Sequence, residues 1–255
     1  MISRRSILAA SAGLLAAPAV RAQGAWPDKP LRFVIGGAAG GVSDIFLRMM
    51  ENRLRERLGQ PMIIDPRPGA GGMVGAEVTA RSAPDGYSFY INHIASHGIG
   101  PTLYRRLSFD PLKDLPGVAR IAAMPNVLII KGDSPIKSVA ELVAFCKANP
   151  ARANFSSAGS GTSSHLSGLL FGMRMGVEVT HVPYRGTAPS MAAVMNGETL
   201  FAIDNAPASR QQVLGGLLKA LGVSTAKRSS TMPEVPSLKN RACQISMSLH
   251  GMASP

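Results

Sequence analysis

Residues 31–44 read LRFVIGGAAGGVSD, a short β-rich apolar run that leads directly into a glycine loop. From Ile45 to Leu58 apolar side chains recur at helical spacing, and Gly59 ends the pattern. The stretch therefore predicts a buried strand, a glycine loop and a helix in succession. Proteins built from such units bind ligands at the loops where strands end and helices begin.

The same alternation repeats along the chain. Short apolar runs predict further strands at 61–64, 87–91, 127–130, 153–156, 177–182, 200–203 and 218–223. Helical spacing predicts helices that end near Arg81 and that span 139–147, 163–175 and 189–195. In the helix 163–175, one face carries Leu166, Leu169, Leu170 and Met173. Strands alternating with helices predict an α/β architecture with mostly parallel sheets flanked by helices.

Composition and charge exclude several classes of protein. The chain has 255 residues, 45% of them hydrophobic and 16% charged, which indicates a globular protein with a sizeable core. Its formal charge is +12, but the basic residues form no consecutive block and are not interleaved with aromatic residues. This pattern does not favour nucleic acid as a partner.

The N-terminus predicts an export signal over residues 1–22. The pair Arg4-Arg5 precedes an apolar run, residues 7–20, that is too short to span a bilayer, and cleavage is expected near Ala22. We therefore expect a periplasmic protein, with the general secretion route and the twin-arginine route both open. Loss of this segment and its three arginines leaves a formal charge of +9, which suits an acidic small molecule.

Three strand-to-helix loops are rich in Gly, Ser or Thr. They are residues 40–44, 157–165 and 184–187. Each can present backbone N–H groups at the start of a helix, where the helix dipole also favours an anion. Together the three loops predict a cradle for a carboxylate. For any single loop, ordinary capping and turn formation is the competing interpretation.

Patterns typical of catalysis and of cofactors are missing from the sequence. Ser164 and His165 are adjacent, but neighbouring side chains on a helix do not face each other. The chain has no GxSxG, HExxH, GxGxxG or GxxxxGK[ST] motif, and Cys146 and Cys243 lack the CxxC spacing of metal or redox sites. We expect no enzyme activity, no cofactor and no metal.

The chain resembles the periplasmic receptors of tripartite tricarboxylate transporters, the Bug-type solute-binding proteins. The resemblance covers the sequence downstream of the export signal and rests on ten motifs in order. These are WPDKP (26–30), GGVSD (40–44), RPGAGG (67–72), APDGY (83–87), DPLKD (110–114), PNVL (125–128), SAGSGTSSHL (157–166), HVPYRG (181–186), DN (204–205) and STAKR (224–228).

The resemblance implies a two-lobe, type II periplasmic binding protein, or Venus flytrap. Lobe 1 is expected to comprise 23–124 plus 223–255, and lobe 2 to comprise 125–222. The ligand is expected to be a small carboxylate: a di- or tricarboxylate, an amino acid, an aromatic acid or a related amide. It is expected to bind between the two lobes. The receptor is expected to be a monomer that delivers the ligand to permease subunits in the membrane. The implied ligand-binding residues are Gly40, Gly41, Ser43, Asp44, Ser96, His97, Ser157, Gly159, Ser160, Gly161, Thr162, Ser163, Ser164, His165, Tyr184, Arg185, Gly186, Asp204 and Asn205.

Two of these residues have more than one interpretation. Asp44 either orients its own loop or contacts an amine or hydroxyl of the ligand, and His165 either contacts the ligand or bonds to the neighbouring loop. The similarity also fades after about Lys239, so we expect the C-terminal part of lobe 1 to be missing. Alternatives to a binding receptor are therefore a truncated, non-binding remnant and a hydrolase that uses Ser164 or His165.

Overall fold

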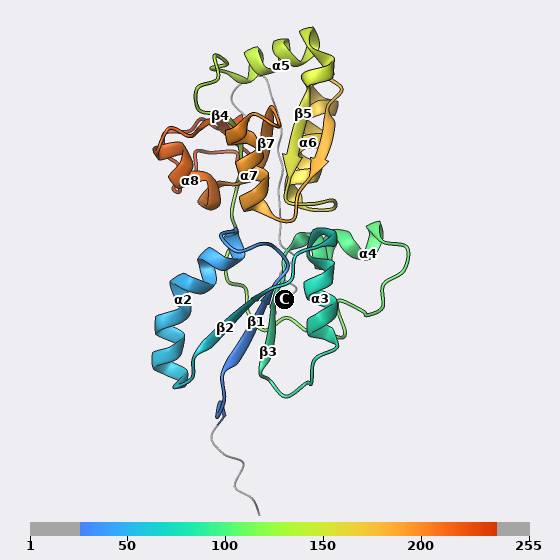
Figure 1. The fold of residues 1–255 in the computed structure, drawn as a ribbon, viewed down its shortest axis with the longest axis vertical. Coiled ribbons are helices and arrows are strands. Elements are labelled where there is room, and N and C mark those ends of the chain that lie inside the picture. The colour runs from blue at the N-terminus through green and yellow to red at the C-terminus, as the bar shows by residue number, and fades with distance from the viewer. Residues whose placement is uncertain (1–25, 239–255) are drawn as a thin grey trace, which may run out of the picture.

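The computed structural model describes residues 26–238, which form two α/β units, each built on its own sheet (Figure 1). The expected export signal, and the part of lobe 1 expected from residue 239 onward, lie outside the described residues. Within residues 26–238, no helix combines the length and the apolar character needed to cross a membrane.

The first unit contains a three-stranded parallel sheet. Its strands are β1 (Leu31–Ile35), β2 (Met62–Pro66) and β3 (Ser88–Ile91), in the order β2-β1-β3. Helix α2 (Val42–Leu58) packs against one face of this sheet, and α3 (Met73–Ala80) packs against β1 and β3. Three short helical segments complete the unit: η1 (Ala70–Gly72), η2 (Ala95–Ile99) and α4 (Gly100–Leu103).

Helix α2 begins and ends where the sequence predicts. Leu47 is fully buried against Ile35 and Met62, so one face of the helix covers the sheet. Gly59 adopts the left-handed conformation, with φ of 70°, and its N–H bonds to the carbonyl of Arg55. Glycine takes this conformation without steric strain and therefore ends the helix.

The second unit contains a five-stranded sheet in the order β6-β5-β7-β4-β8. Its strands are β4 (Asn126–Lys131), β5 (Asn154–Ser157), β6 (Thr180–Pro183), β7 (Phe201–Asn205) and β8 (Leu218–Val223). Strand β5 runs parallel to β6 and β7, whereas β4 is antiparallel to both β7 and β8. The prediction of an α/β architecture with mostly parallel sheets is confirmed, and the antiparallel pairings are those of β4.

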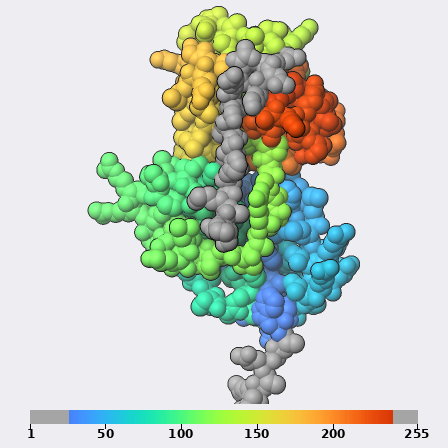
Figure 2. Space-filling model, turned by 180° about the vertical axis from the view of Figure 1, so that it is seen from behind, coloured from blue at the N-terminus to red at the C-terminus, as the bar shows by residue number. Residues whose placement is uncertain are grey.

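The direction of β4 follows from where the chain enters the second unit. The segment between α4 and β4 crosses from the first unit, on the face that Figure 2 shows. It reaches the sheet at the edge where β7 ends, because Asn126 pairs with Asn205. A strand that starts at this edge must run away from it, so β4 opposes β7.

Helices cover both faces of the second sheet. Helices α5 (Val139–Ala148) and α6 (Ser163–Met175) share a core with Leu128 and Ile130 of β4. Helices α7 (Thr187–Asn196) and α8 (Ala206–Leu214) share a core with Val127 and Ile129. Alternate residues of β4 thus point to opposite faces, and both faces are buried.

Helix α6 packs on the sheet through its smallest residues. Gly168 lies against the ring of Phe155 so closely that an added Cβ would overlap it, and Ser167 is fully buried. Of the predicted apolar face, Leu166, Leu169 and Met173 lie toward solvent, with Met173 81% exposed, whereas Leu170 packs against the core. Close approach of helix and sheet therefore selects Gly and Ser, and leaves part of the apolar stripe uncovered.

Candidate functional site

The loops at the carboxyl ends of both sheets meet at the boundary between the two units. In one contact, the N–H of Ala38 donates a hydrogen bond to the carbonyl of Arg185 at 3.2 Å. In the other, Gly71 of η1 lies against the carbonyl of Ser160. Four of the helices that follow these loops begin at this boundary, namely α2 from the first unit and α6, α7 and α8 from the second.

The β1–α2 loop is organised by Asp44. This side chain is only 4% exposed, and its Oδ2 accepts a hydrogen bond from the N–H of Gly40 at 2.8 Å. Arg48 forms an ion pair with the same carboxylate, 3.1 Å from Oδ1. The hydrogen bonds from Gly40 and Arg48 both go to Oδ2, whereas Oδ1 is buried and makes no hydrogen bond to any described residue. Gly41, the N-cap residue of α2, provides no side-chain hydrogen bond to the first turn.

The β5–α6 loop is held by side chains of its own helix. Thr162 is the N-cap of α6, and its hydroxyl accepts from the N–H of His165 and donates to the carbonyl of Gly159. Ser164 accepts from the N–H of Ala158 at 3.0 Å. The N–H of Gly161 donates to Nδ1 of His165 at 3.1 Å, so His165 bonds to the neighbouring loop.

A second histidine, from β6, supports the same loop. The rings of His165 and His181 stack with their centroids 4.1 Å apart, and Nε2 of His181 lies 2.6 Å from Oγ of Ser157. Burial lowers the pKa of His165, and burial together with the nearby His165 lowers the pKa of His181 to about 4. Both rings are therefore neutral at neutral pH, as the hydrogen bond that His165 accepts requires.

The β6–α7 and β7–α8 loops complete the second unit's side of the boundary. Gly186 is the N-cap of α7 and Asn205 the N-cap of α8, and neither makes a side-chain capping bond. Tyr184 and Arg185 precede α7, and the Tyr184 hydroxyl donates to Glu198 at 3.2 Å. The first-turn N–H groups of α2, α7 and α8 thus donate to no N-cap side chain, and that of Ala206 in α8 donates instead to the carbonyl of Pro125.

Asp204 is a fully buried carboxyl group at the end of β7. Its Oδ1 accepts hydrogen bonds from the Thr187 hydroxyl and from both the backbone and side-chain N–H groups of Asn205. Its Oδ2 is buried and makes no hydrogen bond to any described residue. Burial raises the pKa of Asp204 to about 6, against the opposing effect of those hydrogen bonds.

Ser96 and His97 bond within the first unit. Ser96 is fully buried, and its hydroxyl donates to the carbonyl of His93 and lies 3.1 Å from Nδ1 of His97. Burial lowers the pKa of His97, while the carbonyls of Leu115 and Pro111 act in the opposite direction. The structure thus gathers the predicted site residues within 40–44, 157–165, 184–186 and 204–205 around the boundary. Ser96 and His97 instead make their hydrogen bonds within the first unit.

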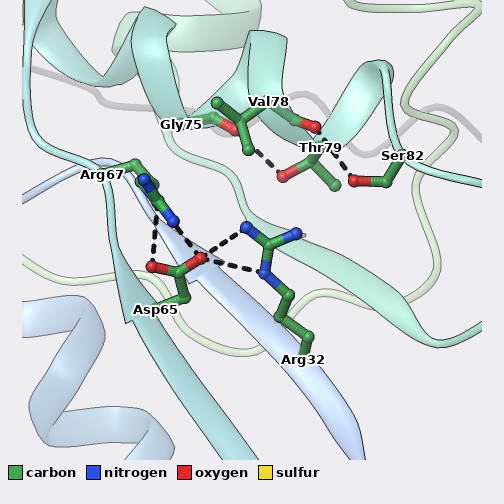
Figure 3. A network of polar contacts seen from close by, with 7 residues as sticks. All are labelled: Arg32, Asp65, Arg67, Gly75, Val78, Thr79 and Ser82. Atoms are coloured by element: carbon green, nitrogen blue, oxygen red, sulfur yellow. Dashed lines mark hydrogen bonds and ion pairs between the residues drawn. The ribbon is translucent and has the colours of Figure 1, made fainter.

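The glycine-rich turn 69–72 also lies at the boundary, although the sequence did not indicate it as part of the site. Arg67, just before this turn, binds Asp65, which also accepts a hydrogen bond from Arg32 at 2.9 Å (Figure 3). Burial by itself raises the pKa of Asp65, but the two guanidinium groups lower it below its usual value. This network anchors the end of β2, from which the turn projects. The run of glycines was the available signal.

The geometry gives little basis for hydrolysis or for metal binding. Ser164 bonds to the loop rather than to His165. The two Ser–His pairs at hydrogen-bond distance, Ser157 with His181 and Ser96 with His97, have serines that are fully buried. Across the described part of the chain, no group of three or more His, Cys, Asp or Glu side chains is placed to hold a metal ion. What the boundary offers a ligand is mainly backbone N–H groups at helix starts.

Comparisons with known proteins agree with this geometry. The family described as tripartite tricarboxylate transporter family receptor matches residues 46–255. The UPF0065 protein in the gbd 5′ region of Cupriavidus necator is 38% identical over 240 residues, which are 93% of this chain and 72% of that protein. Protein BugT of Bordetella pertussis is 31% identical over 214 residues, which are 84% of this chain and 66% of that protein.

Two solved structures share the fold. The Rpa4515 protein of R. palustris, solved with adipate, superposes with a TM-score of 0.82 at 33% identity, covering 86% of this chain and 73% of that chain. MatC from Rhodopseudomonas palustris, solved with bound malate, gives a TM-score of 0.79 at 29% identity, covering 86% of this chain and 74% of that chain.

Proposed function

Because this chain belongs to the family of tripartite tricarboxylate transporter receptors, which are periplasmic solute-binding proteins and not enzymes, we propose that it captures a small carboxylate between its two units. The ligand is then delivered to the permease subunits of such a transporter. In this proposal the first unit belongs to lobe 1 (23–124 plus 223–255) and the second unit to lobe 2 (125–222). The described part of 223–255 nevertheless packs on the second unit, where Met232, Val235 and Leu238 lie in its core. The proposed location is the periplasm, reached through the export signal at residues 1–22.

One observation carries the proposal: helix starts without side-chain caps come from both units and lie at their boundary. Helix α2 contributes from the first unit and α7 from the second. At the start of α8 the N–H of Ala206 already donates to the carbonyl of Pro125, and Pro207 has no N–H. The first N–H groups of a helix have no partner within the helix and lie at the positive end of its dipole. A carboxylate supplies the missing acceptor and the matching charge.

The arrangement favours a ligand with two carboxylates. A dicarboxylate can place one end against the start of α2 and the other against the start of α7, so that each unit binds one charge. Relatives bind such molecules, since the two solved structures hold adipate and malate. Each carboxylate at a helix start contributes about 0.3–2 kcal/mol, so loss of one end weakens binding by up to about 30-fold.

Thermal unfolding with a ligand panel tests the proposal. The panel contains adipate, malate, amino acids and aromatic acids, with hexanoate and adipamide as controls that lack one or both charges of adipate. A ligand at about 100 times its Kd stabilises the folded state by about 2.7 kcal/mol, which raises Tm by roughly 5–10 °C. Calorimetry then measures Kd. A folded protein whose Tm no carboxylate raises would contradict the proposal.

A further inference from the structure

The boundary loops of the first unit form one rigid platform. A Cβ added at Gly36 would lie 2.6 Å from Cα of Gly72, and the Tyr90 hydroxyl donates to the Gly72 carbonyl at 2.8 Å. A Cβ added at Gly72 would lie 2.7 Å from Nε2 of the buried His93. The glycine loop after β1 and the turn after β2 are thus packed backbone to backbone, so they move together.

The facing loops of the second unit are joined in the same way. The N–H of Tyr184 donates to the carbonyl of Ser157 at 2.9 Å, which pairs the two loops where they leave the sheet. A Cβ added at Gly159 would lie 3.3 Å from the Tyr184 carbonyl and 3.4 Å from the N atom of Gly71 in the first unit. A displacement of either loop therefore carries the other with it.

At two of the places where the units touch, peptide groups meet without an intervening side chain. At the first, a Cβ added at Gly71 would overlap the carbonyl oxygen of Ser160. At the second, a Cβ added at Gly186 would lie 2.7 Å from the N atom of Ala38, the atom that donates across the boundary to Arg185. Backbone atoms cannot rotate aside as side chains do, so an added methyl group at either point must push the units apart.

We propose that Gly71 and Gly186 are positioning residues that form a backbone latch, which lets the two units close on each other and so keeps the ligand trapped. The inference rests on the proposed function, because it describes how the same site closes. The latch acts on the closed arrangement and not through contact with the ligand. Affinity then depends on how fully the closed state is populated.

The test compares glycines that share a backbone conformation but differ in what surrounds them. Gly71 has φ of 63° and faces the second unit, whereas Gly176, at the end of α6, has φ of 60° and open space around it. Gly71→Ala and Gly176→Ala therefore introduce the same left-handed strain, and only Gly71→Ala adds a wedge at the boundary. Gly186→Ala is the second latch variant; because Gly186 has φ of 127° and is the N-cap of α7, its decisive readout is the ligand-induced compaction.

Calorimetry with the tightest-binding carboxylate of the panel gives the first readout. Gly71→Ala and Gly186→Ala should each weaken binding by about tenfold or more, mainly through faster dissociation, and Gly176→Ala should stay within about twofold of the unaltered protein. Small-angle scattering gives the second readout. Ligand should compact the unaltered protein and Gly176→Ala, but not the latch variants.

The outcomes separate the latch from the proposed function. If the unaltered protein binds and the latch variants match Gly176→Ala in affinity and in compaction, the latch is wrong and the receptor function stands. If Gly176→Ala loses as much affinity as Gly71→Ala, backbone strain explains the loss and the latch is again wrong. If the unaltered protein binds nothing, both proposals fall. Circular dichroism identifies a variant that does not fold, and the other latch variant then decides.

Discussion

Replacing Asp204 with Asn should change how the stability of the protein depends on pH. The carboxyl group is fully buried, and burial raises its pKa from 3.8 to about 6. The folded protein therefore binds this proton more tightly than the unfolded chain does. As a result, Asp204 stabilises the fold at low pH, and this contribution is lost as the pH rises from about 3.8 through about 6.

The size of the effect follows from the pKa difference. A shift from 3.8 to about 6 corresponds to about 3 kcal/mol. About 2 kcal/mol of this change falls between about pH 4.5 and about pH 7.5. Across this range the carboxyl of the unfolded chain is largely ionised, while that of the folded protein changes from protonated to ionised. In Asp204→Asn the amide cannot ionise, and its NH2 group takes the place of the buried Oδ2, which lowers stability by about 1–3 kcal/mol relative to the protein with a protonated Asp204.

Urea unfolding at several pH values measures the prediction. The stability of Asp204→Asn minus that of the unaltered protein should rise by about 2 kcal/mol between about pH 4.5 and about pH 7.5. The neutral histidines impose the opposite pH dependence, but they are common to both proteins and cancel in the difference. Asp133→Asn, at an exposed position, is the control and should change stability by less than about 0.5 kcal/mol throughout. A pH-independent difference for Asp204→Asn would refute the reasoning.

Three further predictions concern the second unit. Thr162→Ala removes the N-cap of α6 and should lower the unfolding free energy by about 1 kcal/mol, whereas Thr162→Ser should not, as urea unfolding will show. Gly168→Ala drives a methyl group into the Phe155 ring and should destabilise the protein by about 1–3 kcal/mol, part of which Phe155→Leu should restore in the double variant. The stability that neutral His181 contributes is present above about pH 6.5 and is lost as the pH falls toward about 4. His181→Gln should therefore reduce the dependence of the unfolding free energy on pH between about 4 and about 6.5, and an unchanged dependence would contradict this prediction.

Local signals were enough to predict the order of elements and many of their ends. Glycine ends α2 at Gly59 and α7 at Gly197, both in the left-handed conformation, because only glycine takes it freely. The contacts of Asp44 with Gly40 and of His165 with Gly161 each span four residues at a helix start. Such contacts follow from helical geometry, so the sequence could suggest them without knowledge of the fold.

Other features depend on residues that are far apart in the sequence. The predicted strand ends place the loops at sheet edges, but nothing local shows that Gly71 meets Ser160 or that Ser157 meets His181. Helix α8 was not predicted, because its buried positions are small residues such as Ala206 and Ser209 that form no apolar stripe. The ligand-binding role of the predicted residues stays a prediction.

Periodicity, glycines and helix caps report the conformation of a few neighbouring residues, and these established the α/β class and the strand-loop-helix starts. The direction of β4, the buried face of α6, the isolation of the Asp204 carboxyl and the backbone contacts across the boundary arise when separate elements pack. Packing brings together groups whose distance along the chain carries no information about their distance in space. These features therefore depend on the tertiary structure and cannot be predicted from local sequence.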